Sequence, residues 1–120
     1  MTQLNTGTDL VPTARREGTA VVAAIVGEID LHNSPELRDA MIDVLLRGDP
    51  QKLILDLANV PYMDSSALAV LVEALKRLQR AGGRIFLFNL QPRVKGLLEI
   101  ARLDTIFNVV KDEREAMEKA

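Results

Sequence analysis

Apolar residues follow two alternating patterns along the chain, short continuous runs and stripes with helical spacing. Leu53–Leu57 and Ile85–Phe88 are runs that should be buried on both faces, as strands of a parallel sheet are. The segment between them carries one apolar stripe, formed by Leu68, Leu71, Val72, Leu75 and Leu78. This spacing predicts a helix from about residue 65 to 81, closed by Gly82-Gly83. Strand, helix and strand in this order predict a right-handed parallel crossover.

Two strands are expected before this unit. Leu10–Arg16 and Thr19–Gly27 have the composition of a hairpin joined by a tight turn at Glu17-Gly18. Pro12 has no N–H group to donate to a sheet, so the first strand is expected at an edge. Residues 1–9 are polar and are expected to be loosely ordered, which leaves residues 10–120 as one folded domain.

Three further helices complete the predicted fold. Asn33-Ser34-Pro35-Glu36 is typical of a helix start, and Gly48 is expected to end that helix. Its buried stripe would be Leu37, Ala40, Met41, Val44 and Leu45. A helix from Pro92 should bury Val94, Leu97, Leu98 and Ala101. Asp112 with Glu115 resembles a capping box before a terminal helix, and Phe107–Val110 could add a short strand. The expected fold class is α/β, with a mixed four- to five-stranded sheet, an N-terminal antiparallel hairpin and about four helices.

Composition narrows the possible functions. The 120 residues fit one domain, and 15 basic and 17 acidic residues are mixed along the chain, so no nucleic-acid footprint is indicated. The chain has no Cys, and its longest apolar run, Ala20–Val26, is too short to span a bilayer. Met1–Leu4 lacks the pattern of a signal peptide. We therefore expect a cytoplasmic domain without direct nucleic-acid or membrane binding.

The segment Tyr62–Leu68 carries the most informative chemistry. Ser65 and Ser66 follow Asp64 at the start of the predicted central helix, where unpaired N–H groups and the positive end of the helix dipole meet solvent. These residues can simply cap the helix. They can also hold a phosphate, or carry one as a phosphoserine. Local sequence leaves both interpretations open.

Catalytic interpretations find little support. His32 is the only histidine, and with Asp30 only two residues away it is poorly placed to form a triad with Ser65. No Gly-rich nucleotide-binding loop is present. Asp30, Asp56 and Asp64 could attract a divalent cation by charge, but their spacing does not require one. We expect no intrinsic enzymatic activity, no cofactor and no metal.

A response-regulator receiver is the main rival fold, because Asp56–Asp64 looks like a phosphoacceptor region. A receiver places an acidic pair at the end of its first strand, where a metal sits beside the acceptor aspartate. In this chain that position falls near Pro12, and Lys111 comes too late to be the lysine after the fifth strand. The receiver interpretation therefore fails.

The order of motifs resembles the STAS domain family, and more narrowly the bacterial anti-sigma factor antagonists. The resemblance rests on Gly27-Glu28-Ile29-Asp30, Leu55-Asp56-Leu57, Val60–Ser66 and the helix that ends at Gly82-Gly83. It extends from about Ala20 to Phe107, and the Asp-Ser-Ser element is its most specific part. One position departs from the family, because Ala67 stands where the antagonists usually carry glycine.

The resemblance implies a phosphorylation switch. In the family, the serine that matches Ser65 is phosphorylated by the partner anti-sigma factor, which is a serine kinase, and a serine phosphatase reverses the reaction. The unphosphorylated antagonist binds the anti-sigma factor and frees a sigma factor. Asp30 and Asp64 match the family's acidic residues beside the serine. STAS domains also serve as adaptors in stress-signalling or transport complexes, and that alternative stays open.

The expected partner surface covers the N-terminal half of the central helix and the loop that precedes the first long helix. Its predicted members are Asp30, His32, Asp64, Ser65, Ser66, Ala67, Ala69 and Val70. Val70 falls roughly opposite the apolar stripe at 100° per residue, so we expect it to be an exposed apolar contact. A monomer or weak dimer is expected.

Overall fold

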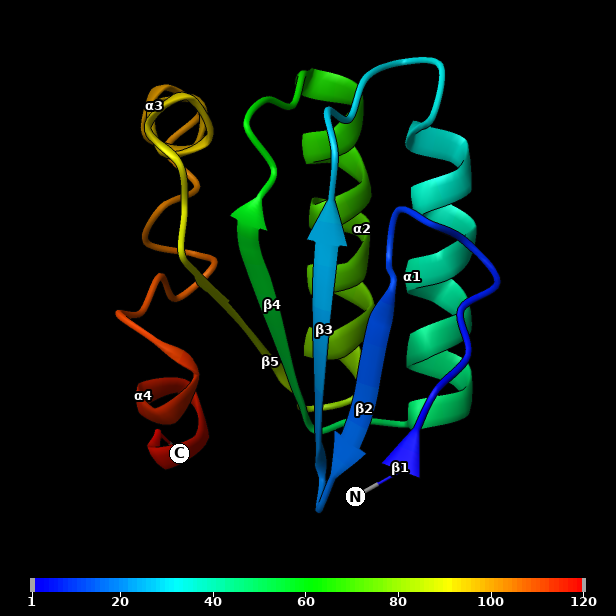
Figure 1. Cartoon of the computed structure of the whole chain (residues 1–120). Helices are drawn as coiled ribbons and strands as arrows, with labels where there is room; N and C mark the ends of the chain where they lie inside the picture. The colour runs from blue at the N-terminus through cyan, green and yellow to red at the C-terminus, as the bar shows by residue number, and fades with distance from the viewer. Residues whose placement is uncertain (1, 120) are drawn as a thin grey trace.

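In the computed structural model, residues 2–119 are described and form a five-stranded sheet with four helices. The strands lie in the sheet in chain order: β1 (Thr2–Gln3), β2 (Thr13–Glu17), β3 (Ala20–Val26), β4 (Lys52–Asn59) and β5 (Arg84–Phe88). The first three are antiparallel, and β3, β4 and β5 are parallel (Figure 1). The predicted mixed sheet with its N-terminal hairpin is confirmed.

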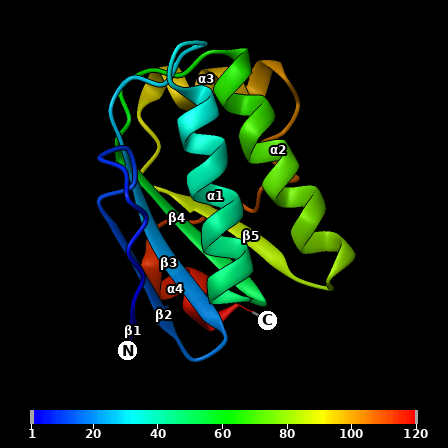
Figure 2. The same ribbon diagram turned by 90° about the vertical axis from the view of Figure 1, so that its right-hand side faces the viewer.

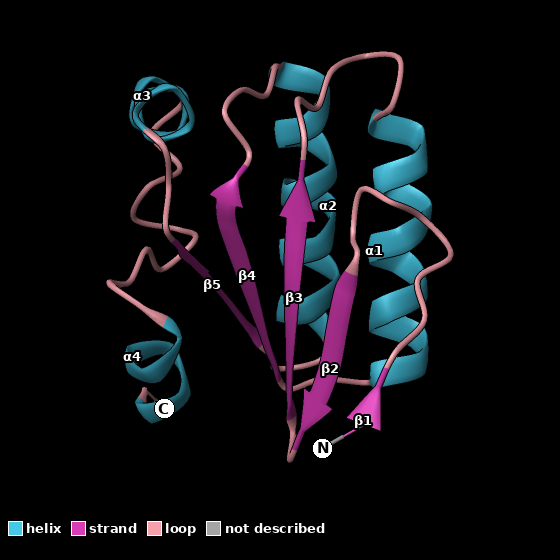
Figure 3. Ribbon diagram, in the orientation of Figure 1, coloured by secondary structure: helices cyan, strands magenta, loops and turns pink. Residues whose placement is uncertain are grey.

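The helices lie on both faces of this sheet. They are α1 (Ser34–Gly48), α2 (Ser65–Arg80), α3 (Pro92–Ile100) and α4 (Glu113–Glu118). The helices α1 and α2 run side by side over one face, whereas α4 lies against the other (Figures 1 and 2). Helix α2 links the parallel strands β4 and β5, as the predicted crossover requires (Figure 3).

The main core lies between the sheet and the pair α1 and α2. Alternate strand residues face these helices, among them Val21, Ala23, Leu53, Leu55, Ile85 and Leu87. Helix α1 ends at Gly48 as expected, although the left-handed residue that follows is Asp49 (φ 42°). Gly48 is needed for close packing, because a Cβ atom there would lie 2.8 Å from Val21 Cγ2. The missing side chain of Gly48 thus lets the end of α1 approach β3 closely.

A smaller apolar cluster covers the opposite face. It consists of Ala20, Val22, Ile54, Phe86, Phe88, Val110 and Ala116. The Lys52 ammonium donates hydrogen bonds to the Ala116 and Met117 carbonyls, at 2.9 and 3.0 Å. Burial lowers the pKa of Lys52, and the nearby Arg84 acts in the same direction. Asp112 accepts a hydrogen bond from the Glu115 N–H at 2.8 Å, which is the predicted cap of α4.

Three local expectations are wrong. Thr2 and Gln3 pair with β2, so the strand after Pro12 is not at the edge of the sheet. Ala101 is exposed, because α3 ends at Ile100 and the chain turns away. Phe107–Val110 forms one bridge, Val109 to Leu87, instead of a strand. Met1 and Ala120, which belong to the predicted N-terminal segment and domain, lie outside the described residues.

Candidate functional site

Two loops meet at the carboxyl edge of the parallel strands. The Ile29 N–H donates to the Tyr62 carbonyl, and the Asp64 N–H donates to the Ile29 carbonyl, both at 3.1 Å. These bonds tie the loop before α1 to the loop before α2. Asp30 and Asp64 therefore lie on one rim of the sheet, beside the start of α2.

Asp64 caps α2. One carboxylate oxygen accepts hydrogen bonds from the Ser66 N–H at 2.9 Å, the Ala67 N–H at 3.3 Å and the Ser66 hydroxyl. The Ser66 hydroxyl lowers the pKa of Asp64, and the N–H groups of Ala67, Ser66 and Leu31 act in the same direction. Asp64 is therefore ionised at neutral pH, and its negative charge lies at the positive end of the helix.

The two serines differ in their surroundings. Ser66 is half-buried on the side of α1, and its hydroxyl is held by Asp64. Ser65 is exposed on the other side of α2, and its hydroxyl makes no hydrogen bond to any residue in the range 2–119. Only the Ser65 hydroxyl is open to attack a phosphoryl group without first breaking a bond to Asp64.

Asp30 stabilises its own loop. Its carboxylate accepts hydrogen bonds from the N–H groups of His32 at 2.9 Å and Asn33 at 3.3 Å. Asn33 occupies the position before α1, yet its side chain makes no capping bond; it accepts from the Asp30 N–H and donates to the Glu28 carbonyl. The loop is therefore rigidly cross-linked. It presents His32 and Leu31 to solvent, and the Leu31 side chain is 72% exposed.

Two predicted surface residues are buried. Val70 is only 7% exposed and the Ala67 side chain is fully buried, so the expectation that they offer contacts off the core face is wrong. The helical count considered the face of α2 toward the sheet, but α1 covers a second face, onto which Ala67, Val70 and Ala74 project. Ala69 is exposed as expected.

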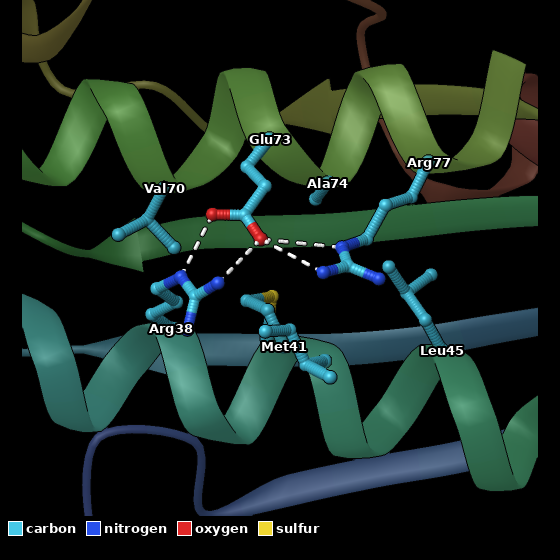
Figure 4. Close-up of a pocket in the computed structure, with 8 residues that line it drawn as sticks. Arg38, Met41, Leu45, Val70, Glu73, Ala74 and Arg77 are labelled. Carbon is cyan, nitrogen blue, oxygen red and sulfur yellow. Dashed lines mark hydrogen bonds and ion pairs between the residues drawn. The ribbon is translucent and has the colours of Figure 1, made fainter.

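Charged groups close the seam between α1 and α2 (Figure 4). Arg38 donates two hydrogen bonds to the Glu73 carboxylate, at 2.8 and 3.0 Å, and Arg77 donates to the same carboxylate at 3.2 Å. The bonds from Arg38, followed by those from Arg77, lower the pKa of Glu73. Below these groups Val70 and Ala74 face Met41 and Leu45, and the seam leaves no room for water. Nearer the rim, an open hollow of about 290 Å³ lies between Ser66 and Pro35.

The other side of α2 is open. A groove of about 490 Å³ runs between α2 and the segment that follows α3. Its lining consists of Ser65, Leu68, Ala69, Val72, Glu73, Lys76 and Leu103. Ser65 therefore lies where this groove meets the rim of the sheet.

Within residues 2–119 no three His, Cys, Asp or Glu side chains gather as a metal site. Among the described helices, none is both long and apolar enough to cross a membrane. The site is a surface of hydroxyl, carboxylate and apolar groups on rigid supports.

Comparison with known proteins identifies the family. The model of the STAS domain matches residues 11–116, and the chain belongs to that family. The anti-sigma-B factor antagonist of Bacillus subtilis is 34% identical over 85 residues, which cover 71% of this chain and 76% of the relative. The anti-sigma-B factor antagonist of Listeria monocytogenes is 35% identical over 91 residues, covering 76% and 79%. A crystal structure of a Thermotoga maritima protein superposes with a TM-score of 0.81 at 27% identity, covering 88% of this chain and 90% of that one.

Sequence reasoning missed several residues of this region. Leu31 stands alone between Asp30 and His32, and an apolar residue between two polar ones on a tight loop is a signal that could have been noticed. Helical spacing places Lys76 on the same face of α2 as Ala69 and Glu73, but Leu103 gave no signal, because it reaches this face only through the packing of the α3–α4 connection beside α2.

Proposed function

We propose that this protein is an anti-sigma factor antagonist that is switched off by phosphorylation of Ser65. Unphosphorylated, it binds an anti-sigma factor with serine kinase activity and so releases a sigma factor; after phosphorylation, a serine phosphatase restores the unphosphorylated, binding form. It acts in the cytoplasm, as a monomer or weak dimer, and as a substrate of the kinase without catalytic activity of its own. The observation that carries this proposal is the exposed, unbonded hydroxyl of Ser65 at the head of α2. The names of the related proteins support it.

The switch works through charge at the interface. A phosphate adds about −1.5 to −2 charge, and at a helix N-terminus it is locally tolerated, so the fold need not change. Asp30 and Asp64 flank the same rim, so phosphorylation makes the patch strongly negative. A partner surface shaped for a neutral hydroxyl must then desolvate this charge. A loss of only a few kcal/mol is sufficient, since each 1.4 kcal/mol is about tenfold in affinity.

The apolar anchor of this interface is Leu31 instead of Val70. Leu31 is the large exposed apolar side chain on the loop that carries Asp30 and His32. Its rigid backbone lowers the entropy lost when a partner covers it. The docking surface we propose consists of this loop, Asp64, Ser65, Ser66 and Ala69.

Phosphorylation is tested directly with each anti-sigma factor kinase encoded in the genome of the source organism. The protein is incubated with the purified kinase and ATP, and intact mass and peptide mapping locate the phosphate. We expect one phosphate, lost in Ser65→Ala and retained in Ser66→Ala. A phosphate on Ser66 alone, or none with any kinase, contradicts the proposed switch; the second result favours an adaptor role.

Binding is tested by calorimetry with the kinase that modifies the protein. Ser65→Asp should weaken binding by about tenfold or more, whereas the neutral Ser65→Asn should bind close to wild type. Leu31→Asp should also weaken it. Leu46 is a matched control, because its side chain is 74% exposed, close to the value for Leu31, and lies near the end of α1 away from the rim. Equal effects of Leu31→Asp and Leu46→Asp would remove Leu31 from the interface.

A further inference from the structure

The open groove beside α2 has a volume of about 490 Å³, larger than the hollow of about 290 Å³ between Ser66 and Pro35. Leu68 forms its floor, Val72 and Leu103 are half-buried apolar walls, and Ala69 leaves the middle free of bulk. Figure 2 shows the segment after α3 beside the upper part of α2. Leu103, which belongs to this segment, lines the groove. Apolar side chains are therefore exposed to water along two or three turns of the helix. Exposure of apolar surface is unfavourable, so its burial by a partner would contribute to the free energy of binding.

The shape of the groove excludes a small-molecule pocket. Such sites enclose most of their ligand and place several polar groups around it. This groove is open to solvent along its length, and its polar groups lie only at its two ends and along one side, as Ser65, Lys76 and Glu73. A ridge of side chains from another protein fits this description better.

Charge marks the far end of the groove. Lys76 is exposed and forms no ion pair with any residue in the range 2–119, whereas the neighbouring Glu73 is held by Arg38 and Arg77. Lys76 lies eleven residues after Ser65, about 16 Å along the helix. The groove thus has a hydroxyl at one end, apolar walls in the middle and a free cation at the other.

We propose that this groove is a second recognition site for the anti-sigma factor, and that Lys76 pairs there with a carboxylate of the partner. The occupant is a segment of that partner with one or two apolar side chains followed by an Asp or Glu. This inference rests on the proposed function, because the groove continues the rim that carries Ser65. It adds a determinant of partner choice, since a cation in a desolvated groove rejects partners with a basic residue at that position.

The contributions of Ser65 and Lys76 to partner binding should be independent, because the two residues lie at opposite ends of the groove. Groups more than about 10 Å apart with no shared partner usually contribute additively. A phosphate at Ser65 therefore alters one end of the contact and leaves the pairing at Lys76 intact. Loss of affinity caused by Ser65→Asp and by Lys76→Glu should multiply in the double variant.

Calorimetry with the kinase that binds wild-type protein tests the proposal. Lys76→Glu should weaken binding by about tenfold or more. Arg80→Glu is the matched control, because Arg80 is an exposed cation one turn further along α2 that does not line the groove. Lys76→Met should bind less tightly than wild type and with a weaker dependence on salt. Circular dichroism checks that each variant is folded.

The outcomes separate this proposal from the proposed function. If Ser65→Asp weakens binding but Lys76→Glu does not, the antagonist function stands and the groove proposal is wrong. If Arg80→Glu weakens binding as much as Lys76→Glu, recognition is a general charge effect and the pairing at Lys76 is wrong. If no anti-sigma factor kinase binds the wild-type protein, the proposed function fails and the groove loses the occupant proposed for it.

Discussion

The two sides of α2 differ in packing, because one side is covered by α1 and the other lines an open groove. On the side of α1, Ala67, Val70 and Ala74 are buried, and Arg38, Glu73 and Arg77 close the seam above them. On the side of the α3–α4 connection, Ala69 and Val72 line a groove that stays open. Both sides carry small and apolar residues, so composition alone does not distinguish them. The α1 side is closed over Val70 and Ala74 and opens only near the rim, at the hollow beside Ser66, whereas the other side is open along the groove.

The same contrast separates the two adjacent serines. Ser66 lies toward α1 and its hydroxyl is held by Asp64, whereas Ser65 lies toward the groove with its hydroxyl unbonded. A 100° step around the helix is enough to place one hydroxyl in the structural cap and the other on the open surface. Substitutions on the two sides should therefore differ in kind as well as in size.

The largest difference should come from introducing a charge on each side. Val70→Glu places a carboxylate against Met41 in the closed seam and should lower the free energy of unfolding by about 3 kcal/mol or more. Ala69→Glu, one residue earlier on the exposed surface, should change it by no more than about 0.5 kcal/mol. Urea unfolding measures both. Similar stabilities for the two variants would mean that the seam is not closed in solution.

Added bulk should give a smaller contrast. Ala74→Leu overfills the space between α1 and α2 and should lower the free energy of unfolding by about 1–3 kcal/mol. Ala69→Leu extends into the open groove without displacing packed side chains and should stay within about 0.5 kcal/mol of wild type. Thermal unfolding followed by circular dichroism makes the comparison. A neutral Ala74→Leu would show that α1 can move away from α2 without cost.

Low pH should weaken the contribution of the Asp64 cap of α2 to the stability of the protein. Because the pKa of folded Asp64 lies below its ordinary value, its contribution is complete above about pH 4 and is lost as the pH falls below that. Asp64→Asn keeps a capping side chain that does not titrate. The stability difference between wild type and Asp64→Asn should therefore shrink as the pH falls below about 4. A difference that stays constant over this range would argue against the charged cap.

The smallest effect is expected from the exposed ion pair. Arg38 and Glu73 are both partly exposed, so their attraction is screened by water and salt. A double-mutant cycle with Arg38→Ala and Glu73→Ala should give a coupling below the effect of Ala74→Leu, decreasing in high salt. A larger coupling that salt does not change would indicate that the ion pair, and not apolar packing, holds α1 against α2.

Most of the fold could be predicted from local patterns. The buried runs of β4 and β5 and the helix starts at Ser34, Ser65, Pro92 and Glu113 rest on interactions within a few residues, which sequence spacing records directly. β1 could not be predicted, because two polar residues become a strand only when β2 offers its free edge. Phe107 and Ala101 depend in the same way on where the chain turns after α3.

The candidate site was only partly predictable. Asp30, Asp64 and Ser65 follow strand ends, and parallel strands bring such ends together, so their grouping on one rim was expected and is what the structure has. Val70 was predicted to be exposed and is buried. Helical spacing gives the angle between residues around the helix, but it does not say which neighbouring element covers each face. Leu31 and Leu103 depend on loop geometry that has no period to detect.

The sequence by itself determined the family, the order of the elements and the residues at the head of α2, because these rest on short-range propensity and on motif spacing. Only the tertiary structure decided which side of α2 is closed and which is open. That choice depends on α1 and the α3–α4 connection packing against α2 from distant parts of the chain. Those contacts determine which side chains are buried and which hydroxyl is left without a hydrogen bond. The Ser65 hydroxyl is therefore exposed and unbonded, whereas the Ser66 hydroxyl is held by Asp64.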